Sequence, residues 1–158
     1  MNNQKSVTIY IDGDAFPNKL NKILFSAINR LELATVAISN KPIDIGRSDY
    51  ITYILVDAGA DLADDRIVEM VVEGDLVITA DIPLADRVIT NKAYVIDHRG
   101  MVLNENNIKS HLATRNLMQE LRNRGEKTKG PDPFGSKDVQ RFANELNSFL
   151  MKRVNHGI

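Results

Sequence analysis

Short apolar runs alternate with helical patterns along the first two-thirds of the chain. Five runs rich in β-branched residues predict strands over residues 6–11, 33–38, 51–56, 76–79 and 93–96. Between them, apolar side chains recurring every three or four residues predict helices over residues 17–31, 61–72 and 83–89. The nearly all-apolar run 76–79 is typical of a parallel strand covered on both faces. The alternation predicts an α/β fold, with a single mainly parallel sheet flanked by helices.

Two further helices are predicted in the last third of the chain. The first runs over about residues 105–123, with Asn104 as its cap and with Ile108, Leu112, Met118 and Leu121 facing inward. A loop with three Gly and two Pro follows over residues 124–135. The second helix begins at Ser136 and has a continuous apolar face: Val139, Phe142, Ala143, Leu146, Phe149 and Leu150. We expect both helices to pack on the same domain, so that residues 1–158 form one domain.

Composition narrows the class of protein. The 158 residues are 43% apolar and 26% charged, which is ordinary for a globular protein. The chain has no Cys, so disulfides, thiolate metal sites and a cysteine nucleophile are excluded. No apolar run approaches the roughly 18 residues of a membrane span, and the first residues lack a signal-peptide pattern, so a cytoplasmic protein without a membrane partner is expected.

Charge is unevenly distributed along the chain, although the net charge is only −1. Residues 1–103 carry 10 basic and 15 acidic side chains, whereas residues 104–158 carry 10 basic and 6 acidic ones. The resulting charges of −5 and +4 suggest a metal at one end of the molecule and a polyanion at the other.

Acidic side chains follow the predicted strands. Asp12 and Asp14 follow the first strand, Asp81 follows the fourth, and Asp97 begins an Asp-His-Arg sequence after the fifth. Ligands of parallel α/β sheets bind outside the carboxyl ends of the strands, so these side chains should gather at one edge. Carboxylate oxygens are the ligands that Mg²⁺ and Mn²⁺ prefer. The pattern predicts a site in which Asp12, Asp14 and Asp81 hold such an ion.

Other interpretations of the charged residues stay open. Asp is favoured at helix N-termini, and Asp61, Asp64, Asp65 and Asp86 all lie near predicted helix starts. The basic stretch from Arg122 to Arg141 either positions phosphates or forms a solvated surface. The chain has no dinucleotide-binding fingerprint and no Walker A sequence, and its three His are scattered.

Several longer motifs resemble a known family. They are the Asp12–Pro17 sequence DGDAFP, ADLADD over residues 60–65, GDLVITADIPLA over residues 74–85, Arg99-Gly100, RNLM over residues 115–118, Gly130-Pro131 and QRFAN over residues 140–144. On these motifs the chain resembles the YaiI/YqxD family of uncharacterised bacterial proteins, which is grouped by fold with the PIN-like and NYN-like nucleases. The resemblance implies a PIN-like α/β fold whose carboxylates use Mg²⁺ or Mn²⁺ to cut RNA.

Site residues follow from the resemblance position by position. It places Asp12, Asp14, Asp81 and either Asp64 or Asp65 around the metal, with Asp61 and Asp86 in reserve. Thr79 would orient a water or a phosphate, and Asn40 would contact the substrate. Two departures stand out: Phe16 replaces a usual Cys, and Asn116 replaces a usual Asp. Thiol chemistry at position 16 is therefore excluded, and an acidic role at position 116 is put in doubt.

The favoured interpretation is a metal-dependent phosphodiesterase that acts on RNA or another nucleic acid. Arg99, Arg115 and Arg141 would engage phosphates, because the guanidinium fork matches phosphate geometry. One alternative is a non-catalytic nucleic-acid-binding or adaptor protein of the same fold, which would need the basic C-terminal region but no metal. Another is a phosphatase with Asp12 as nucleophile, although no matching Lys is evident. The oligomeric state is left open.

Overall fold

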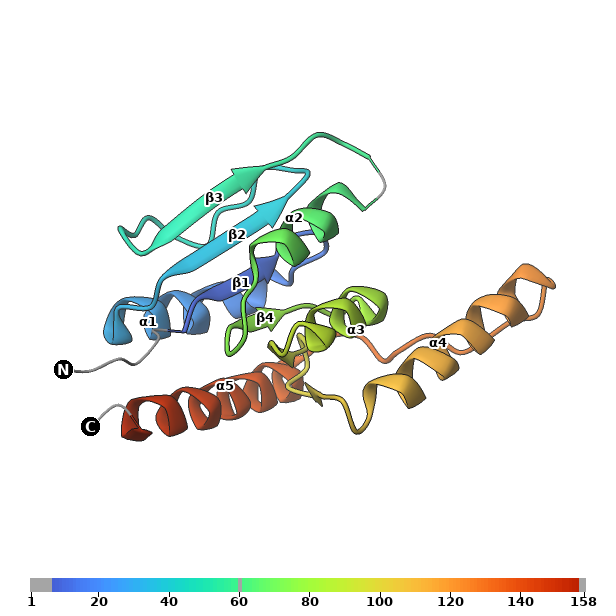
Figure 1. Cartoon of the computed structure of the whole chain (residues 1–158). Coiled ribbons are helices and arrows are strands. Elements are labelled where there is room, and N and C mark those ends of the chain that lie inside the picture. Colours follow the sequence, from blue (N-terminus) through green and yellow to red (C-terminus); the bar gives the residue numbers. More distant parts are fainter. Residues whose placement is uncertain (1–6, 60, 157–158) are drawn as a thin grey trace.

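The centre of the molecule is one six-stranded sheet (Figure 1). The computed structural model describes residues 7–59 and 61–156. The strands are β1 (Ile9–Asp12), β2 (Thr35–Ser39), β3 (Ile51–Leu55), β4 (Leu76–Ile78), β5 (Tyr94–Ile96) and β6 (Val102–Leu103). They lie in the order β3-β2-β1-β4-β5-β6, with β6 antiparallel to β5 and the other neighbours parallel. Ile11 of β1 pairs with Ala37 on one side and Ile78 on the other.

Helices cover both faces of this sheet. They are a short 3-10 helix (Asn18–Leu20), α1 (Asn21–Leu31), α2 (Leu62–Met70), α3 (Ile82–Thr90), α4 (Ile108–Asn123) and α5 (Ser136–His156). Side chains alternate between the two faces along each strand. Ile9 and Ile11 accordingly pack with α1 and α5, whereas Tyr10 packs with α2 and α3. The result is a three-layer arrangement with an apolar core on each side of the sheet.

The predicted fold class is confirmed, with small differences at the ends of the elements. The sheet is mainly parallel, and two helices end the chain. β6 was not predicted, because a strand of two residues leaves no periodic pattern. Asp12, predicted to lie in a loop, is the last residue of β1. Position 6 of the first predicted strand lies outside the described residues.

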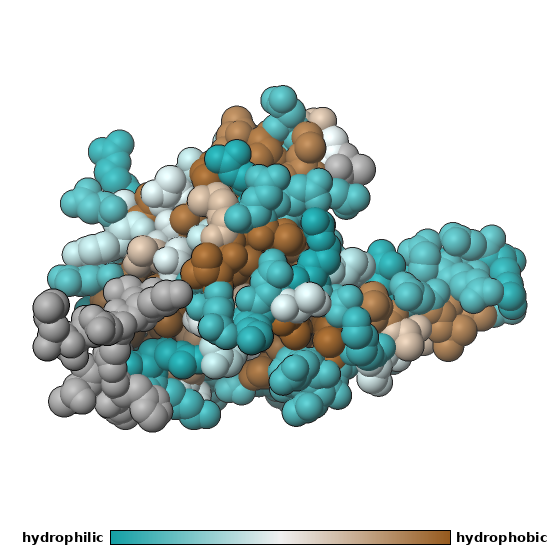
Figure 2. All heavy atoms as spheres, in the orientation of Figure 1, coloured by the Kyte–Doolittle hydropathy of each residue, from teal (hydrophilic) through white to brown (hydrophobic). Residues whose placement is uncertain are grey.

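The two C-terminal helices differ in how they pack, because α5 lies against the sheet and most of α4 does not. Phe142, Leu146 and Leu150 of α5 are fully buried. In α4, Ile108 is buried as predicted, but Met118 is 37% exposed. Figure 1 shows α4 leading away from the sheet, and Figure 2 shows hydrophobic residues along one edge of this projection and hydrophilic residues over the rest.

The projecting segment is called the arm below. It comprises α4 and the return segment 124–135, which leads back to the start of α5. The predicted cap of α4 is also shifted, because Asn107 rather than Asn104 immediately precedes the helix. Among the described residues, no helix is both long enough and apolar enough to cross a membrane.

Candidate functional site

A pocket of about 720 Å³ opens where β1 and β4 end, at the centre of the sheet. From this pair of strands the sheet extends outward on both sides, to β2 and β3 in one direction and to β5 and β6 in the other. Such a reversal of strand order leaves a crevice at the carboxyl edge, which is where open α/β sheets bind ligands. The volume lies within the range of small-molecule sites.

Asp12 forms the floor of this pocket and is only 5% exposed. Its Oδ1 accepts a hydrogen bond from the backbone N–H of Asp14 at 3.3 Å, and its Oδ2 accepts one from the Thr79 hydroxyl at 2.7 Å. Burial, together with the charges of Asp14 and Asp81, raises the pKa of Asp12 to about 6, although both hydrogen bonds act to lower it.

The turn after β1 holds Asp14 against the end of β2. Gly13 makes this close approach possible, because a Cβ at that position would lie 2.7 Å from side-chain atoms of Ile43 and Ser39. Asp14 Oδ1 accepts a hydrogen bond from the backbone N–H of Asn40 at 3.1 Å. Asp14 and Asn40 both line the pocket, so the structure brings these two predicted residues together.

Thr79 and Asp81 are placed by the end of β4. Thr79 is fully buried, and its Oγ accepts a hydrogen bond from the backbone N–H of Asp81 at 3.0 Å. Asp81 caps α3, since its Oδ1 accepts a hydrogen bond from the backbone N–H of Leu84 at 3.1 Å. Asp81 lines the pocket as well, so its capping role and its pocket position occur together.

Helix α2 distinguishes between its two adjacent carboxylates. Asp64 lines the pocket together with Asp61, which lies just before the helix. Asp65 is outside the lining and forms an exposed ion pair with Arg87 at 2.9 Å. Burial and the neighbouring carboxylates of Asp81, Asp12 and Asp61 together raise the pKa of Asp64 to about 7. Unbalanced negative charge is thus concentrated around Asp64.

The remaining predicted residues lie at varied distances from this centre. Arg99 lines the pocket, and its guanidinium Nη1 is 3.1 Å from Asp138 Oδ2. Arg115 lies on the exposed surface of α4, Arg141 lies on α5 beside Asp138, and neither lines the pocket. Asp86 is also outside the lining, where it pairs with Lys109 at 2.9 Å. Contacts of Arg115 and Arg141 with a substrate stay predictions.

Sequence reasoning placed Asp97 and His98 at the edge of the sheet without giving either a role, and it did not include Phe134; all three line the pocket. Asp97 follows β5 directly, and its Oδ1 accepts hydrogen bonds from the backbone N–H groups of Arg99 and Met101. His98 is 7% exposed, and its ring makes an edge-to-face contact with Phe16 at 5.4 Å. The position of Asp97 and His98 after a strand was the signal available for both of them. Phe134 lies in the return segment of the arm, and no sequence pattern connected that segment with the strand ends.

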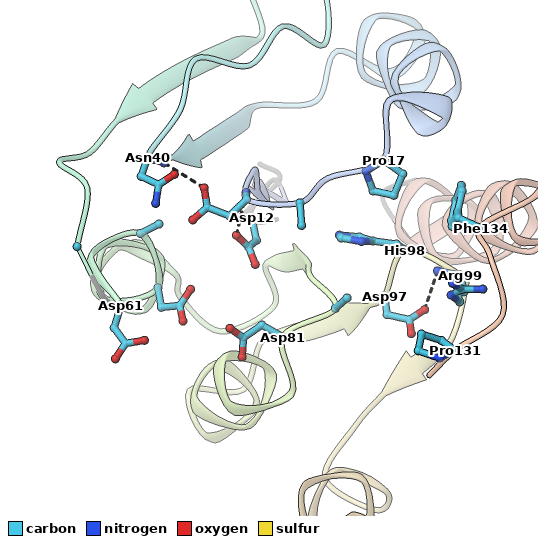
Figure 3. A pocket seen from close by; sticks show the side chains of 16 residues that line it. Asp12, Pro17, Asn40, Asp61, Asp81, Asp97, His98, Arg99, Pro131 and Phe134 are labelled. Atoms are coloured by element: carbon cyan, nitrogen blue, oxygen red, sulfur yellow. Dashed lines mark hydrogen bonds between the residues drawn. The ribbon is translucent and has the colours of Figure 1, made fainter. Parts of the chain in front are cut away.

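The pocket has two chemically different sides, as Figure 3 shows. The acidic side consists of Asp12, Asp14, Asp61, Asp64 and Asp81, from β1, β4 and α2. The ring side consists of Pro17, His98, Arg99, Pro131 and Phe134, from the turn after β5, the start of the 3-10 helix and the arm.

The fit of the acidic side to a metal depends on how many of its carboxylates can reach one ion. Within residues 7–59 and 61–153, whose side chains the structure describes, no three His, Asp or Glu side chains are grouped closely enough to ligate one ion directly. Mg²⁺, however, keeps several of its waters and commonly binds through one or two carboxylates together with substrate phosphates. The carboxylates around Asp64 therefore fit a largely hydrated hard cation, and they do not form a closed cage.

Comparisons with other proteins place this chain in a family. The family profile described as "Uncharacterized BCR, YaiI/YqxD family" matches residues 10–152. A UPF0178 protein of Sulfurimonas denitrificans is 59% identical over 146 residues, which are 92% of this chain and 97% of that relative. A UPF0178 protein of a Sulfurovum species is 56% identical, over 92% of this chain and 99% of the relative.

No solved structure matches this chain significantly. The resemblance to PIN-like domains consequently stays a prediction, whereas the family itself is shown by the extent and the identity of the sequence matches. The chain belongs to the YaiI/YqxD family.

Proposed function

We propose that the protein is a phosphodiesterase, acting on RNA or another nucleic acid, that depends on Mg²⁺ or Mn²⁺. The observation that carries this proposal is the crowding of carboxylates at the point where the strand order reverses. Asp81 lies close enough to raise the pKa of both Asp12 and Asp64, and Asp12 also raises the pKa of Asp64. Among the described residues that line the pocket, Arg99 is the one basic side chain with a permanent charge, and Asp138 pairs with it. A divalent cation would balance the remaining negative charge.

Different residues of the chain would then hold the ion and accept a proton from the attacking water. Asp12 and Asp81 are fixed by hydrogen bonds from Thr79 and from the N-terminus of α3, so they would hold the ion in one position. Asp64 would accept a proton from the attacking water, because it lines the pocket beside Asp12 and Asp81. When bound, the ion supplies Lewis-acid stabilisation of the phosphate and lowers the pKa of water.

Asp81→Asn is the first test. Asn caps helices about as well as Asp, so this variant should fold with its α3 cap intact. It loses only the negative charge that Asp81 places beside Asp64. We expect Mn²⁺ binding, measured by calorimetry with and without a short single-stranded RNA, to weaken strongly. Cleavage of that RNA should be lost. Unchanged Mn²⁺ binding and unchanged cleavage in both Asp12→Asn and Asp81→Asn would contradict the proposal.

Asp64 and Asp65 form a matched pair for a second test. They are adjacent on α2, but only Asp64 lines the pocket. We expect Asp64→Asn to abolish cleavage and Asp65→Asn, which removes the exposed pair with Arg87, to preserve it. Loss of cleavage in Asp65→Asn but not in Asp64→Asn would assign the proposed base to Asp65 and would contradict the role given to Asp64 by its pocket position.

A non-catalytic nucleic-acid-binding protein is the second candidate, and the arm is the observation that favours it. Residues 108–135 carry six Lys and Arg against three Asp and Glu, and most of these side chains are exposed. Basic surfaces bind phosphate backbones without any metal. Charge reversal at Lys127 and Lys129 would then reduce RNA binding more than Asp81→Asn does, and binding without cleavage would favour this candidate.

The phosphatase alternative has the least support. A nucleophilic Asp needs an accessible oxygen, whereas Asp12 is 5% exposed and both of its oxygens accept hydrogen bonds. No Lys is among the described residues that line the pocket. A phosphoenzyme trapped on Asp12 would reverse this ranking.

A further inference from the structure

The pocket is larger than a metal ion and a phosphate require. A cation with six waters occupies roughly 200 Å³, at about 30 Å³ per water. The pocket measures about 720 Å³, and the ring side accounts for the part that lies away from the carboxylates (Figure 3). This part has a different chemistry, with two aromatic rings, two prolines and Arg99, and Asp97 beside Arg99 is its carboxylate among the described lining residues (Figure 3).

His98 brings a buried polar atom without a partner to this side. Its Nε2 is inaccessible to solvent and has no hydrogen-bond partner within the part of the chain that the structure describes. Leaving such an atom unpaired costs free energy, so it is a rare feature that calls for an explanation. Burial and the charge of Arg99 lower the pKa of His98 to about 4, so the imidazole is neutral at pH 7. A neutral imidazole can donate a hydrogen bond from one ring nitrogen and accept one at the other.

Arg99 fixes the other ring of this side. Its guanidinium carbon lies 5.7 Å from the centre of the Phe134 ring, and Nη2 donates a hydrogen bond to the carbonyl oxygen of Asp132 at 2.6 Å. Nη1 also donates to Asp138 Oδ2, at the start of α5. These contacts hold the return segment of the arm against the turn after β5. The Phe134 side chain is therefore held in place at the wall of the pocket.

We propose that the ring side is a nucleobase subsite, in which an unstacked base contacts the Phe134 ring and hydrogen-bonds through its edge with the imidazole of His98. This inference names the ligand chemistry of the same pocket and so rests on the proposed function. A nucleobase is a flat heterocycle whose faces are apolar and whose edge carries donors and acceptors, and it thus matches two rings and one unpaired nitrogen. The acidic side, with its ion, would take the adjoining phosphate.

The test uses nucleosides, because they carry the base without any phosphate and need no metal. The full chain, labelled with ¹⁵N and ¹³C, is titrated with adenosine, guanosine, cytidine, uridine and, as the baseless control, ribose. We expect at least one nucleoside to shift the NMR signals of His98 and Phe134, and ribose to leave them in place. Shifts that ribose reproduces, or no shift with any nucleoside at millimolar concentration, would overturn the proposal.

Two sets of variants make this test specific. Phe134→Leu keeps apolar volume but removes the aromatic face, and we expect it to weaken nucleoside binding about 5-fold or more. Phe149→Leu, on α5 beside Tyr94, is the matched control and should leave nucleoside binding unchanged. His98→Phe keeps a ring against Phe16 but removes the nitrogens, so it should reduce discrimination among the four nucleosides, and His98→Gln should restore part of it. Equal affinities in all four variants would contradict the subsite.

The source of the base is distinguished by a further comparison. If the base belongs to a nucleic acid, a short single-stranded RNA should bind more tightly than its nucleoside and more tightly than the same RNA in a duplex. Equal affinity for strand and nucleoside would identify a free nucleoside or nucleotide as the ligand, with the subsite itself supported. Nucleoside binding without RNA cleavage would defeat the proposed function alone, whereas cleavage without nucleoside binding would defeat the subsite alone.

Discussion

Helices α4 and α5 follow one another at the end of the chain, but only α5 is embedded in the core. Phe142, Leu146 and Leu150 of α5 are each at most 1% exposed and pack against the sheet. In α4, Ile108 is the one buried side chain among the described residues, and the helix then leads away from the sheet (Figure 1). One helix therefore contributes to the stability of the fold, and the other mainly carries a segment of chain away from the body and back to the pocket.

The difference teaches how an amphipathic pattern should be interpreted. In α5, apolar residues return to the same face at every turn from Val139 to Leu150. In α4, that face is interrupted, because Arg115 occupies the position that would continue from Ile108 and Leu112. Leu117 and Leu121 lie about half a turn around the helix from Ile108, at 100° per residue. A helix is thus predictable from its periodicity, whereas its burial depends on an unbroken apolar face.

The largest expected difference between the two helices concerns apolar truncations. Phe142→Ala in α5 should lower the free energy of unfolding by about 3–5 kcal/mol, because it leaves a cavity in a fully buried site. Met118→Ala in α4 should change it by no more than about 0.5 kcal/mol, since that side chain is already solvated. Urea unfolding followed by circular dichroism measures both values, and similar losses in the two variants would contradict the assigned roles.

Two glycines test the same comparison at the backbone. Gly100 has a φ of 85°, and a Cβ there would lie 2.6 Å from the backbone carbon and oxygen of Arg141 in α5. Gly125, just after α4, has a φ of 83° with no atom of the described residues within 4 Å of its Cβ position. Both Ala substitutions incur the cost of a left-handed conformation. We expect Gly100→Ala to lower the free energy of unfolding by about 1–3 kcal/mol more than Gly125→Ala does, because only at Gly100 must the backbone of α5 move to make room for the Cβ. Thermal or urea unfolding measures both values. Equal losses would show that α5 is not held tightly against this turn.

A smaller difference is expected between the acidic residues of the two helices. Asp138 of α5 is 8% exposed and accepts hydrogen bonds from Arg99 and from the backbone N–H of Gly135. Glu120 of α4 forms an exposed pair with Arg124 at 2.7 Å. Asp138→Asn should cost about 1–3 kcal/mol, because it leaves Arg99 partly buried without its counter-charge. Glu120→Gln should cost at most about 0.5 kcal/mol. Urea unfolding of the two variants measures both costs. Adding 1 M salt should weaken the exposed Glu120–Arg124 pair more than the partly buried Asp138–Arg99 pair.

The acidic side of the pocket, whose residues lie outside α4 and α5, provides an effect of opposite sign. The pKa of Asp64 is about 7 in the folded protein, compared with 3.8 for an unperturbed Asp. The folded state binds this proton more tightly than the unfolded chain does, so stability from this group falls as pH rises from about 4 to 7. Asp64→Asn should therefore be more stable than the wild type at pH 8, and the gain should disappear near pH 4. A gain of the same size at both pH values would show that Asp64 is not under charge repulsion.

Much of the fold was predictable because its elements have strong periodic signals. The five parallel strands and the helix faces were readable from β-branched runs and from residues such as Leu24, Ile28 and Phe142. The order of the strands was not readable, because it depends on which edges meet in space. The two-residue strand β6 and the direction of α4 were missed for the same reason, since each depends on a partner that lies outside the local sequence.

The candidate site divides in the same way. Asp12, Asp14 and Asp81 lie at or just after strand ends, so their shared edge follows from the fold class, whereas Asp61 and Asp64 come from the start of α2. The choice between Asp64 and Asp65 depends on helix phase, and one residue, or 100° of rotation, decides which of them enters the pocket. The ring side combines His98 after β5 with Phe134 from the arm. Nothing in either segment indicates that the chain returns to this point after leaving the sheet.

The exposed tip of the arm has a consequence for the continuity of the chain. Lys127 and Lys129 are exposed there, between Gly125 and Gly130, and such segments are preferred sites of proteolytic cleavage. A trypsin cut at this tip would separate α5 from the sheet in sequence while leaving Phe142, Leu146 and Leu150 packed in place. The protein should therefore persist as a noncovalent complex of two fragments, and two separately expressed pieces divided at the tip should reconstitute one folded molecule.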